Sequence, residues 1–157
     1  MINAEFTDYL LGVLAVLLAW AAVVDLRSRT IPDWVSIAIL VLAPVFWWTS
    51  GVELWPDAAS RVGAALAVFG LFALLFYMGG MGGGDVKLAG ALALWFGPLT
   101  TLKFVILTSL AGGVVSLATW WWHKRRGGEG KAEVPYGVAI AFAGMWLLAQ
   151  RFLNHFA

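Results

Sequence analysis

Asp25 and Asp85 are the residues of this sequence whose type and placement best suit chemistry. Asp25 ends a long apolar run, and Asp85 follows five glycines in six positions and precedes another apolar segment. A carboxylate at the edge of a membrane segment is costly unless it is paired, hydrated or catalytic. When two carboxylates lie close together, one stays protonated, because ionising both costs too much. Such a pair can activate water against an amide carbonyl and then protonate the leaving amine.

The sequence offers little support for other chemistries. It contains no cysteine, which excludes a thiol nucleophile and a cysteine zinc site. No serine stands in a Gly-x-Ser-x-Gly motif, and the glycine run lacks the Gly-Lys-Ser/Thr ending of a phosphate-binding loop. His123 and His155 are far apart and are expected to be interfacial residues. We therefore expect no metal and no cofactor.

Composition indicates that the elements positioning these acids are membrane helices. Hydrophobic residues make up 62% of the 157 residues and charged residues 12%, with a mean hydropathy of +0.86. A water-soluble chain of this size would lack a polar surface. Six of the ten tryptophans, at positions 47, 48, 55, 120, 121 and 122, lie near the ends of apolar segments, where an indole ring favours the lipid headgroup boundary. The net charge of +1 argues against a nucleic-acid partner.

Six apolar segments approach the roughly 20 residues that a membrane-spanning helix needs. They cover about residues 9–24, 34–50 and 62–78, two segments on either side of Gly97-Pro98, and about residues 134–153. The sequence before the first segment has two acids and no basic residue, unlike a cleaved signal peptide. We predict an all-α polytopic membrane protein with about six transmembrane helices, forming a single domain over residues 1–157.

The basic residues predict the orientation of these helices. With six alternating spans, seven basic residues share one side of the membrane and three share the other. Because basic loops stay in the cytoplasm, both termini are expected outside, and Asp25 and Asp85 near the cytoplasmic face. The seven are Arg27, Arg29, Lys87, Lys124, Arg125, Arg126 and Lys131; the three are Arg61, Lys103 and Arg151.

The fourth segment is too short to cross the bilayer alone. Residues 85–97 would form a helix of about 20 Å, against a hydrocarbon core of about 30 Å. Asp85 is therefore expected to lie below the membrane surface, in a glycine-rich stretch. Irregular backbone at that depth must be buried in protein or line a water-filled cavity, and water is what hydrolysis needs.

These residues resemble a known family. Gly82, Gly84 and Asp85 form the G-x-G-D signature of intramembrane aspartyl proteases, and the continuation through Lys87 resembles the G-x-G-D-x-K-L form of type IV prepilin peptidases. Asp25 with the later Ile31-Pro32 resembles the family's other aspartate motif, although Asp33 stands where asparagine is usual. Pro135, Tyr136 and Gly137 are similar to its Pro-Phe/Tyr-Gly element.

The resemblance implies an aspartic endopeptidase of the bacterial cytoplasmic membrane. Such enzymes remove the short basic leader from prepilin-like precursors at the inner face. It further implies catalytic roles for Asp25 and Asp85, and contacts with the substrate from Gly82, Gly84, Lys87, Pro135, Tyr136 and Gly137. Larger members also N-methylate the new terminus. This shorter, cysteine-free chain resembles the peptidase-only forms of tight-adherence pili and the archaeal preflagellin peptidases, so methyltransferase activity is not expected.

Simpler interpretations remain for several of these residues. Asp85 also fits a hydrated boundary residue or an N-cap, and Asp33 fits an N-cap or turn residue better than a catalyst. Lys87 is expected either to anchor its helix at the membrane surface or to modulate Asp85 electrostatically. A second function for the two acids is proton or cation binding in a small transporter. Inverted repeats and acids near the membrane midplane would favour the transporter, but the sequence shows no such repeat.

Overall fold

The computed structural model describes residues 2–126 and 134–156, which form helices joined by turns and short loops. Lys131, one of the predicted cytoplasmic basic residues, lies outside the described residues, as does the side chain of His155. The helices are α1 (Ile2–Ser28), α2 (Asp33–Thr49), η1 (Leu54–Ala58), α3 (Ala59–Tyr77), α4 (Gly83–Ala93), α5 (Pro98–Arg125) and α6 (Tyr136–Phe156). The prediction of an all-α polytopic membrane protein is confirmed.

Four described helices are long and apolar enough to cross a membrane, namely 4–28, 54–77, 98–125 and 136–153. The apolar helix α2 has 17 residues and α4 only 11. At 1.5 Å per residue, α4 is about 16 Å long, shorter even than the sequence predicted. It ends early because the chain turns at Trp95 and Phe96, whose amides bond to the carbonyls three residues before them.

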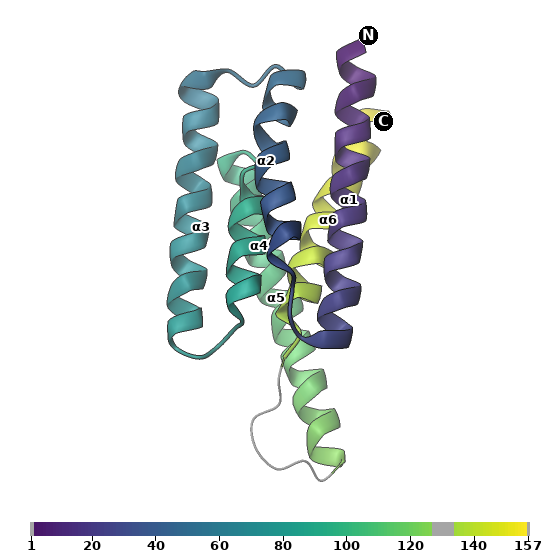
Figure 1. The fold of residues 1–157 in the computed structure, drawn as a ribbon, viewed down its shortest axis with the longest axis vertical. Helices are drawn as coiled ribbons and strands as arrows, with labels where there is room; N and C mark the ends of the chain where they lie inside the picture. Colours follow the sequence, from purple (N-terminus) through teal and green to yellow (C-terminus); the bar gives the residue numbers. More distant parts are fainter. Residues whose placement is uncertain (1, 127–133, 157) are drawn as a thin grey trace.

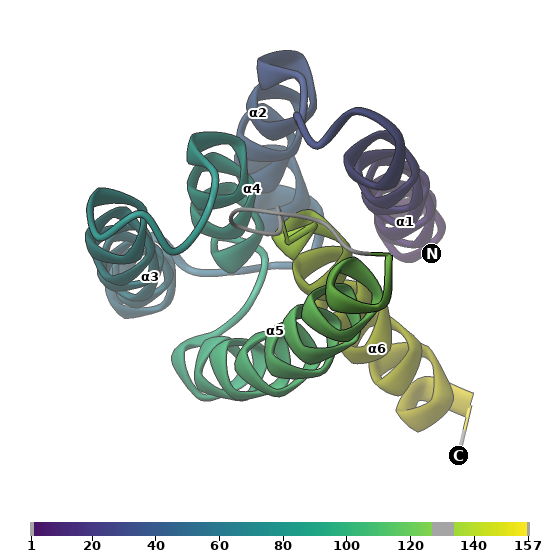
Figure 2. The same ribbon diagram turned by 90° about the horizontal axis from the view of Figure 1, so that it is seen from below.

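Helix α4 lies inside the bundle, packed against α2, α3 and α6 (Figures 1 and 2). All its residues from Asp85 to Ala93, except Lys87, are buried. Gly90 permits close packing on α3, since a Cβ there would lie 3.0 Å from Cδ2 of Phe69. The end of α4 is fixed by the buried Trp95, whose indole donates a hydrogen bond to the Ile39 carbonyl at 2.9 Å. The short helix α4 therefore forms the centre of the fold.

The two ends of the bundle differ. Figure 1 shows the N-terminus, the C-terminus and the α2–α3 connection at one end, with the α1–α2 and α3–α4 connections at the other. We call these the terminal end and the aspartate end. Helix α5 extends beyond the other helices at the aspartate end (Figure 1). Its last turns carry Trp120, Trp121 and Trp122, each beneath a cation from Lys124, Arg125 and Arg126 respectively.

Candidate active site

Asp25 lies in the last turns of α1, with only 3% of its surface exposed. Its Oδ2 accepts a hydrogen bond from the backbone N–H of Val138, at 3.2 Å, from the first turn of α6. The backbone of Gly137 also interacts with the carboxylate. Because the amides in the first turn of a helix lack intrahelical partners, they suit a buried carboxylate. The start of α6 therefore holds the Asp25 side chain.

Asp85 occupies the first turn of α4, and 6% of its surface is exposed. Its Oδ2 accepts a hydrogen bond from the backbone N–H of Gly82 at 3.1 Å. This contact completes the helix start, with the acid at the third helical position reaching back to the N-cap residue. Asp85 therefore contributes to the cap from the third helical position, while Gly82 and not Asp85 holds the N-cap position. This contribution does not exclude chemistry, because a carboxylate oxygen accepts more than one hydrogen bond.

Gly137 connects the two acids. Its backbone interacts with both carboxylates, and Asp25 also interacts electrostatically with Asp85. A Cβ at this glycine would lie 2.8 Å from Oδ2 of Asp25 and 2.6 Å from Cδ1 of Ile31. No side chain fits between these groups without moving one of them. The two aspartates, sixty positions apart in sequence, thus meet at the first turn of α6.

Ile31 is the apolar spacer of this arrangement. Ile31 lies close to Gly137 and also to Gly84. If a Cβ were added at Gly84, it would lie 3.3 Å from both the Cβ and the carbonyl oxygen of Ile31. The loop after α1, the start of α4 and the start of α6 therefore converge on one isoleucine. The sequence pattern included Ile31 only as part of a motif, and gave no indication that it separates Gly84 from Gly137.

Lys87 is paired with Asp33. The Lys87 Nζ lies 2.8 Å from Oδ1 of Asp33, and both side chains are more than half exposed. The prediction that Asp33 caps a helix is wrong, because Pro32 holds the N-cap position of α2 and no side-chain cap bond forms there. Asp33 instead binds a lysine 54 positions away. The ion pair joins the start of α2 to the start of α4.

Pro135 and Tyr136 lie between two cavities near the aspartates. A cavity of about 760 Å³ is lined by Pro135 and Val138 together with Arg29 and residues of the long helix α5. A second, of about 310 Å³, is lined by Tyr136, by Gly80 and Met81 of the glycine loop, and by small residues of α5. Tyr136 is fixed by a hydrogen bond from the Ser116 hydroxyl to its phenolic oxygen, at 3.1 Å. The two neighbouring residues at the start of α6 therefore line different cavities, Pro135 the larger and Tyr136 the smaller.

Within residues 2–126 and 134–156, His, Asp and Glu side chains form no group of three that could hold an ion. The site consists of two carboxylates, backbone amides from two helix starts, and an apolar spacer.

Comparison with known proteins identifies the family. Residues 12–117, which include both aspartates, match the Type IV leader peptidase family. The chain belongs to this family. Both buried aspartates lie within the matched residues.

Curated relatives in the leader peptidase family extend the similarity beyond the family match. A prepilin leader peptidase/N-methyltransferase of Burkholderia pseudomallei is 30% identical over 85% of this chain and 43% of its own length. One from Xanthomonas campestris is 31% identical over 80% of this chain and 44% of its own. A type 4 prepilin-like proteins leader peptide-processing enzyme of Escherichia coli is 27% identical over 83% of this chain and 48% of its own length.

The chain spans less than half the length of these curated relatives. No solved structure matches it.

Sequence reasoning missed Val138 and Ile31 as parts of the site. Val138 acts through its backbone N–H, which every residue except proline carries, so its side chain gives no signal. The early position of Val138 in a helix that starts after Pro135 was the one available indication, since such amides lack helical partners.

Proposed function

We propose that this chain is an intramembrane aspartic endopeptidase that removes the leader from type IV prepilin-like precursors. The observation that carries the proposal is the meeting of Asp25 and Asp85 at Gly137, with both carboxylates buried. Membership of the Type IV leader peptidase family supports the same reaction. We propose that residues 1–157 act as one integral membrane domain.

The chemistry needs one ionised and one protonated carboxyl group. The ionised carboxylate takes a proton from water as its oxygen attacks the carbonyl carbon of the leader junction. The protonated carboxyl group donates a hydrogen bond to the carbonyl oxygen as negative charge develops there. When the tetrahedral intermediate collapses, the C–N bond breaks and the new amine receives a proton from the pair. Water supplies both the new carboxyl oxygen and the proton, so no cofactor is required.

The backbone around the pair suits an extended peptide. Gly82 and Gly84 bring main chain close to Asp85, and Pro135, Tyr136 and Gly137 present main chain to Asp25. We propose that these segments bind the residues on either side of the cleaved bond. Lys87, held by Asp33, is proposed to fix the start of α4 relative to α2 while the substrate binds.

The proposed location is the cytoplasmic face of the cytoplasmic membrane, with both termini on the other side. At the aspartate end, the described chain carries Arg27, Arg29 and Lys87, followed by the cationic end of α5. Basic residues flanking membrane helices favour the cytoplasmic side. A precursor whose leader remains in the cytoplasm would then present its cleavage junction at the depth of Asp25 and Asp85.

The transporter alternative uses the same acids but fits the geometry less well. Coupling ions usually bind near the middle of the membrane, in interrupted helices. Asp25 lies three residues before the end of the 27-residue helix α1, so it is about 5 Å from that helix end. Placement near one end of the bundle suits a peptidase acting at a membrane surface.

Cleavage by purified protein tests the proposal. The parent chain, reconstituted in lipid, would be incubated with a prepilin-like precursor beside the Asp25→Asn and Asp85→Asn variants, and leader release would be followed by mass spectrometry. Asp33→Asn is the matched control, because Asp33 lies at the same end of the bundle but is exposed and paired with Lys87.

We expect both catalytic variants to lose cleavage by about a thousandfold or more, as expected for loss of an essential acid or base. The control should keep more than a tenth of the parent rate, because an exposed ion pair contributes about 1 kcal/mol or less. Retained cleavage in a folded Asp25→Asn or Asp85→Asn variant would exclude the paired mechanism. Failure of the parent to cleave, together with proton or cation uptake that requires both acids, would favour the transporter.

A further inference from the structure

The terminal end of the bundle, opposite the two aspartates, contains a cavity lined by three cationic residues. Its volume is about 420 Å³. Arg61 reaches it from α3, Lys103 from α5 and Arg151 from α6, and the described residues that line it include no acid. Gln150 and Thr100 add hydrogen-bonding groups. Three like charges converging on one cavity repel one another, and a bound anion would relieve that repulsion.

The cations are only partly compensated by protein groups. Arg61 donates one hydrogen bond to the Trp95 carbonyl at 3.0 Å, and Arg151 lies over the Phe46 ring at 5.1 Å from its centroid. Asp57 and Asp8 interact electrostatically with Arg61 and Arg151 respectively. Within the described part of the chain, however, no carboxylate lies within 4.0 Å of these cations. Donor groups of both arginines therefore remain available to a ligand.

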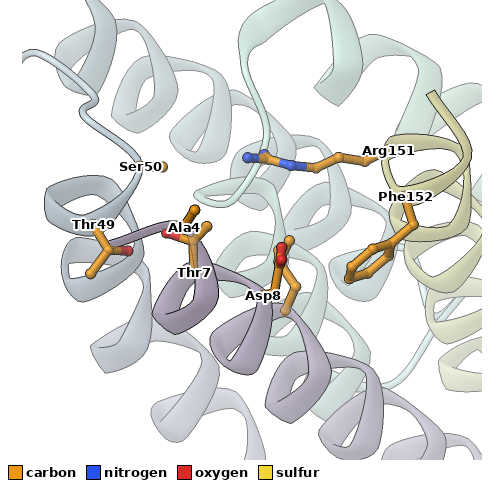
Figure 3. Close-up of a pocket in the computed structure, with 8 residues that line it drawn as sticks. Ala4, Thr7, Asp8, Thr49, Ser50, Arg151 and Phe152 are labelled. Carbon is orange, nitrogen blue, oxygen red and sulfur yellow. The ribbon is translucent and has the colours of Figure 1, made fainter. Parts of the chain in front are cut away.

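Arg151 also borders a second cavity at this end, of about 520 Å³. Figure 3 shows its side chain extending from α6 across that cavity, with Thr7 and Asp8 projecting from α1. The cationic cavity and this one share Leu11 and Arg151. Arg151 therefore borders one cavity that contains Asp8 and another that contains Arg61 and Lys103. An anion is expected only in the cavity with Arg61 and Lys103.

The apolar part of the cationic cavity indicates which anion fits. Buried Trp95, Phe96, Leu147 and Leu148 contribute to the cavity wall beside the cations. Next to Lys103 on α5, Leu99 and Leu102 are exposed by 79% and 58%. A ligand with a phosphate group and hydrocarbon chains would satisfy both surfaces, since its phosphate would face the cations and its chains would cover the leucines.

We propose that the cavity lined by Arg61, Lys103 and Arg151 binds a phosphate group, supplied by the headgroup of an anionic phospholipid. The site is separate from the proposed peptidase centre and does not depend on its activity. A lipid bound there would hold α3, α5 and α6 together at the end opposite the aspartates.

Lipid titration of the purified 157-residue chain tests this proposal. Delipidated protein in detergent would be titrated with phosphatidylglycerol, phosphatidylcholine and, separately, inorganic phosphate. Bound lipid would be counted by native mass spectrometry, and thermal unfolding would be followed in parallel. The variants are Lys103→Gln, Arg151→Gln and their combination. Arg61 is left intact because its bond to Trp95 supports the fold. Arg125→Gln is the matched control, since this cation lies over Trp121 at the other end of the bundle.

We expect the parent to bind one phosphatidylglycerol in preference to phosphatidylcholine. Each single substitution should weaken that binding about fivefold and the combination about 25-fold, from the roughly 1 kcal/mol that each basic residue contributes near anionic lipid. The Arg125→Gln protein should bind like the parent. If phosphate stabilises the parent but not the combined variant, while both bind the two lipids equally, the anion is a soluble phosphate. Equal binding of lipid and phosphate by the parent and a folded combined variant would overturn the proposal.

Discussion

Replacing Gly137 with alanine tests the geometry that brings the two aspartates together. The added Cβ would lie 2.6 Å from Cδ1 of Ile31 and 2.8 Å from Oδ2 of Asp25. Carbon atoms in contact normally lie about 3.5–4.0 Å apart, so Ile31 must move by about 1 Å. Overpacking of this kind costs about 1–3 kcal/mol. The Asp25 oxygen must also move, which weakens its 3.2 Å hydrogen bond from Val138.

Two effects are expected from Gly137→Ala. The melting temperature should fall by a few degrees, as about 1–3 kcal/mol implies for a chain of this size. Cleavage of a prepilin-like precursor should fall about a hundredfold, because a misplacement of about 1 Å in a catalytic group costs about that much. Thermal unfolding in detergent and initial rates of leader release measure the two effects. Gly113→Ala on α5 is the control, because its added Cβ would have no neighbour within 4 Å.

A second substitution separates the two contacts of the new methyl group. Ile31→Val removes Cδ1, so the double variant Gly137→Ala with Ile31→Val loses the 2.6 Å contact and keeps the one to Asp25. We expect thermal stability to recover in the double variant while cleavage stays low. If Gly137→Ala cleaves the precursor like the parent, the close approach of Gly137 to Asp25 in the active protein is refuted.

Two further predictions concern the acid pair and a buried hydroxyl. The cleavage rate should fall on both sides of an optimum pH. The aspartate pair lacks a base when both acids are protonated and lacks an acid when both are ionised. A cleavage rate that keeps rising up to pH 10 would contradict a shared proton. Thr108→Val should leave the melting temperature unchanged or raise it, because the Thr108 hydroxyl is buried without a hydrogen-bond partner in the described structure. In contrast, Thr49→Val should cost about 1 kcal/mol, because its hydroxyl donates to the Phe46 carbonyl at 3.1 Å; equal losses in the two threonine variants would show that the Thr108 hydroxyl is bonded.

The sequence predicted the helices well because apolar runs in lipid have few alternatives to helix. It located their ends less well. Helix α1 begins at Ile2, well before the apolar run, because an acid such as Glu5 is favourable near a helix N-terminus and adds no hydropathy. The turn at Trp95 that shortens α4 depends on a hydrogen bond to Ile39 of another helix. Such a contact between distant residues leaves no periodic pattern in the chain.

The same distinction applies to the site. Asp25 and Asp85 could be predicted because charge is rare in an apolar chain and because helix direction places both acids at one end. The partner of Lys87 could not be predicted, because Asp33 lies 54 positions away and many acids would pair equally well with an exposed lysine. The role of Gly137 could not be predicted either. A glycine that lets Asp25 and Ile31 approach its backbone looks the same in the sequence as a glycine in a turn.

Cross-linking of the two aspartate positions tests most directly whether they meet in the membrane. The chain has no cysteine, so Asp25→Cys with Asp85→Cys introduces the only two thiols. A short bifunctional thiol reagent, applied to protein in lipid vesicles, should join them within one chain, as detected by mass spectrometry after proteolysis. Asp8→Cys with Asp85→Cys, which places thiols at opposite ends of the bundle, should give no such product. Absence of the 25–85 cross-link in folded protein, with both thiols reactive toward a small alkylating reagent, would contradict the paired-aspartate account.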